Sequence, residues 1–122
     1  MSPQDFDRLV DEAMEIIPPR FRRQLKNVVF VVEMEPRTPG LLGLYEGRPR
    51  TERSFAEPYS APDRITIYQG PHERAARGQE ELRRLVEETI WHEVAHYFGL
   101  NEREVLAAEI RRRRKLRQLR KL

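Results

Sequence analysis

The segment from Gly78 to Phe98, GQEELRRLVEETIWHEVAHYF, constrains the fold of this chain more than any other. Apolar residues recur in it at spacings of three and four, which places them on one face of an α-helix. They are Leu82, Leu85, Val86, Ile90, Val94 and Ala95. Gly99 follows, and glycine readily adopts the left-handed conformation that ends many helices. We therefore predict a long amphipathic helix that ends at Gly99.

A second amphipathic pattern lies near the N-terminus, in QDFDRLVDEAMEIIP at residues 4–18. Ser2 ahead of Pro3 is a typical N-cap followed by a proline in the first turn. The pair Pro18 and Pro19 ends the pattern, because proline lacks an N–H and clashes with the preceding turn. We predict an N-terminal helix that stops at these prolines.

Three segments between the helices have the composition of strands. NVVFVVEME, residues 27–35, has a continuous β-branched run, which is typical of a strand covered on both faces. After the turn PRTPG, LLGLYEG at residues 41–47 is a weaker strand. RITIYQG, residues 64–70, alternates apolar and polar side chains, which favours a half-exposed strand at a sheet edge. With RPRTERSFAEPYSAPD, residues 48–63, as a surface loop, the order of elements predicts an α+β fold with helices packed on one small sheet.

The composition limits the chemistry available to this chain. It contains no cysteine, which excludes disulfides and thiolate metal sites, so any metal must be held by His, Asp or Glu. No stretch approaches the roughly 18 apolar residues of a membrane span. The first residues carry acids where a signal peptide has a basic start. We expect a cytoplasmic protein with one domain in residues 1–110.

The charge is distributed unevenly along the chain. The net charge is +3, but the tail RRRRKLRQLRKL, residues 111–122, holds eight of the 23 Lys and Arg residues and no acid. The remaining 15 basic residues stand against 20 acids, so residues 1–110 are acidic. Asn101 and Glu104 have the spacing of a capping box, which predicts a last helix leading into this basic helical tail.

The predicted helix of residues 78–98 carries the motif H-E-x-x-H. His92 and His96 lie four residues apart, so they project from one face, where their imidazoles can close on one ion. Glu93 lies about 100° round the helix, from where its carboxylate can reach a water on the metal without being a ligand. In this motif the glutamate acts as general base. The alternative is a helix end at which histidines interact favourably with the dipole.

A catalytic zinc usually has a third protein ligand. The longer form H-E-x-x-H-x-x-G-x-x-H places it three residues after a glycine. Here that position, after Gly99, is Glu102, and a carboxylate oxygen is an acceptable zinc ligand. An acid in the first turn of a helix is also favoured by the dipole alone. The other candidates are His72, which we expect in a loop, Glu104 and Glu109.

At these residues the chain resembles the small bacterial zincin-like metallopeptidase family. The resemblance includes LLGLYEG followed by RTERS, and PDRITIYQGPHER ahead of HEVAHYFGLNERE, and it covers roughly residues 5–110. It implies a zincin-like fold, in which a small mixed sheet packs on an active-site helix between N- and C-terminal helices. It also implies that His92 and His96 bind zinc and that Glu93 is the base. The family commonly has aspartate where this chain has Glu102.

These residues predict hydrolysis of a peptide bond, with a peptide or protein as substrate. Residues 64–70 are a candidate edge for pairing with an extended peptide, and Tyr68 or Tyr97 is a weaker candidate for stabilising the oxyanion. Two other functions are considered. The domain could bind metal and a partner without cleaving peptides, or the basic tail could bind nucleic acid.

Overall fold

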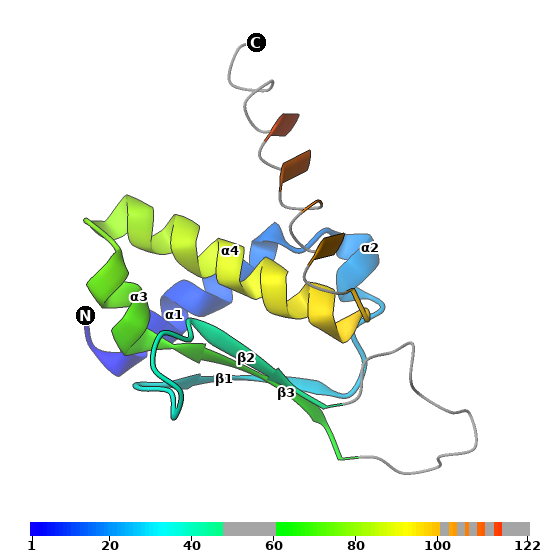
Figure 1. Cartoon of the computed structure of the whole chain (residues 1–122), viewed down its shortest axis with the longest axis horizontal. Helices are drawn as coiled ribbons and strands as arrows, with labels where there is room; N and C mark the ends of the chain where they lie inside the picture. The colour runs from blue at the N-terminus through cyan, green and yellow to red at the C-terminus, as the bar shows by residue number, and fades with distance from the viewer. Residues whose placement is uncertain (48–60, 101–102, 105–106, 108–109, 112–113, 116–122) are drawn as a thin grey trace.

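Figure 1 shows the computed structural model of the chain, in which a small sheet lies against a layer of helices. The structure describes residues 1–47, 61–100, 103–104, 107, 110–111 and 114–115. The elements in chain order are α1 (Pro3–Ala13), the 3-10 turn η1 (Met14–Ile16), α2 (Pro19–Arg22), β1 (Val28–Glu33), β2 (Gly43–Glu46), β3 (Asp63–Tyr68), α3 (Gln69–Ala75) and α4 (Gln79–Tyr97). The predicted α+β class is confirmed.

The sheet of the described residues has the strand order β1–β3–β2. β1 runs parallel to β3, with Val28 opposite Asp63, and β2 runs antiparallel to β3, with Gly43 opposite Ile67. The sheet is therefore mixed. The connection from β1 to β3 passes through β2, which takes the far side of β3.

Two predicted strand positions are wrong. The segment expected at a sheet edge is the central strand β3, where Thr66 is 1% exposed although it lies on the outer face. The segment expected to be covered on both faces is β1, at an edge of the described sheet, where Val29 is 43% exposed. A central strand is shielded by a neighbour on each side, and this shielding depends on strand order rather than on the strand's own composition.

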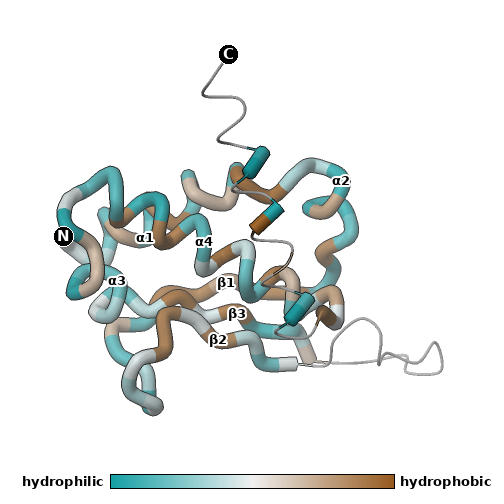
Figure 2. Tube along the Cα trace, turned by 45° about the horizontal axis from the view of Figure 1, so that its top comes forward, coloured by the Kyte–Doolittle hydropathy of each residue, from teal (hydrophilic) through white to brown (hydrophobic). Residues whose placement is uncertain are grey.

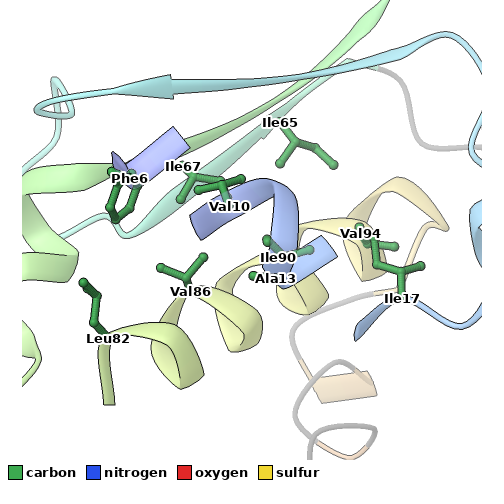
Figure 3. Close-up of a cluster of buried hydrophobic side chains, with 10 residues drawn as sticks. All are labelled: Phe6, Val10, Ala13, Ile17, Ile65, Ile67, Leu82, Val86, Ile90 and Val94. Atoms are coloured by element: carbon green, nitrogen blue, oxygen red, sulfur yellow. The ribbon is translucent and has the colours of Figure 1, made fainter. Parts of the chain in front are cut away.

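The core lies between the sheet and two helices. Figure 3 shows Ile65 and Ile67 of β3 directed toward Val86 and Ile90 of α4, with side chains of α1 beside them. The cluster is completed by Phe6, Val10, Ala13, Ile17, Leu82 and Val94. In Figure 2 the strands carry long hydrophobic stretches, whereas α1 alternates along its length as an amphipathic helix does. This packing fixes one face of α4 and leaves another face for the site.

The N-terminal helix begins as its sequence indicates but ends earlier than predicted. The Ser2 side chain accepts a hydrogen bond from the Asp5 N–H at 3.1 Å, so the predicted N-cap is confirmed. The regular helix ends at Ala13 and the chain continues as the 3-10 turn η1 before the prolines. Pro19 also begins α2, because proline fits the first position of a helix.

Helix α3, which follows β3 without a break, was not predicted from the sequence. We expected a loop at His72, yet Gly70 and Pro71 are both accommodated in the first turn of a helix, where the proline needs no hydrogen-bond partner. The Gly70 N–H donates to Met34 O at 2.9 Å, and Arg74 forms two hydrogen bonds with Glu35 at 2.7 and 2.9 Å. These contacts hold α3 against the segment after β1.

Two predicted segments fall wholly or largely outside the described residues. The surface loop lies mostly in residues 48–60, and the cap residue Asn101 is also outside. The residues described from 103 onward have helical backbone, which agrees with a last helix. No helix of the described chain is long and apolar enough to span a bilayer.

Candidate metal centre

The site is built on the C-terminal half of α4. Val86, Ile90 and Val94 face the core, which turns a different side of the helix toward β2 and the cleft beside it. The predicted helix and its end are confirmed. Gly99 has φ +84°, its N–H donates to His96 O at 2.9 Å, and the Leu100 N–H donates to Ala95 O at 3.1 Å. This pair of bonds is a Schellman motif, which redirects the chain directly after the histidines.

His92 and His96 lie side by side on α4. Their ring centroids are 4.9 Å apart and the ring planes are inclined at 72°. Both side chains are half-buried, so they can be reached from solvent. The helix therefore brings the two predicted imidazole ligands together before any metal binds, as their i, i+4 spacing requires.

Glu93 lies on the side of α4 that faces β2, and it is 7% exposed. A β-carbon on Gly43 would lie 3.2 Å from Glu93 Cγ and 2.7 Å from Thr89 Cγ2. Only a residue without a side chain allows this approach of strand to helix. The stem of Glu93 is therefore held between the helix and the backbone of β2.

A cleft of about 270 Å³ opens at this contact. One wall is the chain from Gly40 to Gly43, and the other is the α4 face that carries His92 and Glu93. The remaining lining residues are Leu85, Glu88 and Thr89. One candidate ligand, the candidate base and an apolar wall thus share one opening.

Gly43 and Thr89 were not predicted as parts of this candidate site. Helical spacing gave a signal for Thr89, since it lies three residues before His92 and four before Glu93. Nothing in the sequence gives the approach of Gly43, because it depends on the order of strands in the sheet.

His72 is not a metal ligand, and it is not in a loop. It lies on α3 and is 0% exposed. Its Nδ1 is 2.6 Å from Tyr68 O and its Nε2 is 2.8 Å from Thr89 Oγ1, so both ring nitrogens are occupied within the core. Burial lowers its pKa below the usual 6.5, which favours the neutral ring.

Two of the three remaining candidates for a third ligand lie outside the described residues. Glu102 and Glu109 lie outside the described residues, and Glu104 is exposed on the helical segment that follows. Among the described residues, no group of three or more His, Asp or Glu side chains is arranged to hold a metal. Glu102 stays a prediction.

The residues present fit a zinc ion. Imidazole nitrogens are common zinc ligands, and a single helix presents two of them with centroids 4.9 Å apart. A carboxylate sits beside them at the cleft without belonging to the histidine pair. This is the donor set that H-E-x-x-H requires.

Neither tyrosine considered for the oxyanion faces the cleft. The Tyr97 hydroxyl accepts from the Lys26 N–H at 3.0 Å, which ties α4 to the segment before β1. Tyr68 follows Ile67 on β3, so it points to the face of the sheet opposite the core, and burial raises its pKa. Neither side chain lines the cleft beside His92 and Glu93.

Comparisons with known proteins bear on the family of this chain. The chain is similar to a solved structure described as a conserved hypothetical protein from Thermo thermophilus, with 26% identity and a TM-score of 0.53. The alignment covers 80% of this chain and 94% of that one. No curated protein matches the chain. The family model for zincin-like metallopeptidases matches residues 25–112, which include all three strands and the whole of α4. The chain therefore belongs to the zincin-like metallopeptidase family.

Proposed function

We propose that this chain is a zinc-dependent peptidase in which His92 and His96 hold the metal and Glu93 transfers protons. The observation that carries the proposal is the pairing of the two imidazoles on α4, 4.9 Å apart, next to a cleft that also contains Glu93. Membership of the family supports a peptidase as the class of enzyme. Glu102 is the proposed third ligand, on the spacing of the motif after Gly99.

When bound, zinc makes a water acidic and polarises the carbonyl of the peptide. The chain's own residues then handle the protons. The Glu93 carboxylate accepts a proton from the attacking water and delivers it to the nitrogen of the leaving amine. Contact with Gly43 restricts the Glu93 stem, so the carboxylate keeps a narrow range of positions in the cleft.

The proposed binding edge for a peptide changes with the strand order. Both sides of β3 are occupied by β1 and β2, so pairing of a peptide with β3, the predicted edge, is wrong. β2 uses one side for β3, and its start at Gly43 forms part of the cleft wall. An extended peptide pairing with the outer side of β2 would bring a peptide bond past Glu93.

The test compares Glu93→Gln with the control Glu87→Gln. Glu87 lies on the same helix and pairs with Arg83 at 3.5 Å, away from the cleft lining. We expect the wild type and both variants to bind one zinc, and only Glu93→Gln to lose peptide cleavage. Zinc per chain is measured by elemental analysis, and cleavage by mass spectrometry of a peptide library.

Retained cleavage in Glu93→Gln would refute the role of Glu93. Zinc binding without cleavage by the wild type would identify a metal-binding module instead. Nucleic-acid binding by the tail and the division at residue 110 stay predictions, since residues 116–122 and several before them lie outside the described structure. A cytoplasmic location also stays a prediction.

A further inference from the structure

We infer that His72 is a positioning residue for the cleft. It fixes the side-chain rotamer of Thr89 so that the Thr89 methyl group faces Gly43, and it thereby sets the gap between α4 and β2 that holds Glu93. The effect on catalysis rests on the proposed function, whereas the effect on Thr89 does not.

The hydrogen bonds of His72 define its tautomer. A carbonyl oxygen can only accept, so the contact of 2.6 Å with Tyr68 O places a hydrogen on Nδ1. In a neutral ring Nε2 is then an acceptor, and the Thr89 hydroxyl at 2.8 Å donates to it. Phe6 packs beside the ring with centroids 5.9 Å apart, so the ring plane is also held from α1.

Thr89 has two ways to arrange its side chain on a helix. A threonine hydroxyl can bond to the carbonyl one turn earlier in either of two rotamers, so threonine lacks the single preference of valine. Here Thr89 Oγ1 lies 3.0 Å from Leu85 O and 2.8 Å from His72 Nε2, so in this rotamer its one hydrogen is shared between these two acceptors. The bond to His72 therefore selects one rotamer.

The selected rotamer decides what faces the sheet. With the hydroxyl directed to His72, Cγ2 lies against Gly43, where a β-carbon would be 2.7 Å away. Glu93 Cγ, one turn further, meets the same position at 3.2 Å. The methyl of Thr89 and the stem of Glu93 thus support β2 side by side. If the methyl turned away, β2 would lose one of these supports and Glu93 would gain freedom.

Two variants of His72 test the roles of its two ring nitrogens separately. Glutamine places an amide near the position of Nε2 and can still meet Thr89, whereas asparagine places one near Nδ1 and cannot. Both remove the ring and they differ by one methylene, so the Thr89 rotamer, rather than stability alone, separates the hydrogen bond from packing. The χ1 angle of Thr89 is measured from three-bond couplings to its labelled methyl carbon.

We expect one Thr89 rotamer in the wild type and in His72→Gln, and averaged rotamers in His72→Asn. An unchanged rotamer in His72→Asn would overturn the inference. If His72→Asn does not fold, the tautomer of the His72 ring in the wild type tests the inference instead. Nitrogen shifts must show a protonated Nδ1 and an unprotonated Nε2 near neutral pH, and the opposite tautomer would overturn the inference.

Kinetics tests the consequence for Glu93. We expect His72→Asn to lower kcat about ten-fold or more with KM and zinc affinity little changed, and His72→Gln to restore kcat, since misplacement of a catalytic group is costly. Averaged rotamers with unchanged kcat would refute the link to catalysis. If the wild type cleaves no peptide, the proposed function fails, and the rotamer measurement still decides the role of His72.

Discussion

Replacing Gly43 with alanine tests whether the close approach of β2 to α4 shapes the site. The added β-carbon would meet Thr89 Cγ2 at 2.7 Å, and both Glu93 Cγ and Thr66 O at 3.2 Å. The first distance is far below van der Waals contact, so the strand or the helix must move. Gly43 is not among the residues with positive φ, so the backbone conformation itself accepts alanine.

The expected loss of stability follows from two opposing effects. Overpacking of a well-filled contact costs about 1–3 kcal/mol. Replacing glycine with alanine returns about 0.5–1 kcal/mol, because the unfolded chain has less conformational freedom. We therefore expect Gly43→Ala to lower the free energy of unfolding by about 1–2 kcal/mol, measured by urea denaturation.

Thr89→Ser identifies the contact that causes the loss. Serine keeps the hydroxyl for His72 but removes Cγ2, the nearest atom to the added carbon. Alone, it should cost about 1 kcal/mol for the lost methyl burial. Combined with Gly43→Ala, it should reduce the cost of the alanine by about 1 kcal/mol, which a double-mutant cycle reports as coupling.

Gly40→Ala is the matched control. Gly40 lies in the same wall of the cleft with φ +89°, and nothing lies within 4 Å of its added β-carbon. Its cost, about 1–2 kcal/mol, comes from the left-handed backbone and not from a neighbour. It should show no coupling to Thr89→Ser. Additive losses for Gly43→Ala and Thr89→Ser would refute the argument from close approach.

Two further predictions concern His72 and the two glycines at the ends of α4. Burial lowers the pKa of His72 below 6.5, so at acid pH the unfolded chain binds a proton that the folded chain does not. The free energy of unfolding should therefore fall as the pH drops below 6.5, by up to about 1.4 kcal/mol per pH unit. Urea titrations at several pH values should show that His72→Gln removes this component. Gly99→Ala, at φ +84°, should cost about 1 kcal/mol, and Gly78→Ala, at φ +118° and ψ 172°, a conformation that almost only glycine adopts, should cost about 1–3 kcal/mol. Only Gly99→Ala should weaken zinc affinity in a chelator competition, since Gly99 lies between His96 and the proposed ligand Glu102; equal zinc affinities would argue against Glu102.

The helices of this chain could be predicted because their signals are local. The stripe from Leu82 to Val94 and the glycine at 99 define α4, and Ser2 defines the start of α1. His92 and His96 share a face through the helical period alone. Each of these inferences needs only residues close in sequence, and the structure bears them out.

The sheet could not be predicted in the same way. Val29 in an apolar run is 43% exposed, while Thr66 in an alternating segment is 1% exposed. The difference arises because β3 has a neighbour on each side, and strand order is decided by packing between distant segments. The role of His72 was missed for the same reason, since its partner Thr89 lies 17 residues away on another helix.

The strand order also explains how one helix can carry most of the site. β3 lies in the centre, so β2 occupies the far side and reaches α4 at Gly43. That approach encloses Glu93 while His92 and His96 stay half-buried. For the roles proposed here, a base needs a restricted position and metal ligands need an open one, and adjacent faces of the same helix provide both. A short strand beginning with glycine is thus as much a part of the site as the motif itself.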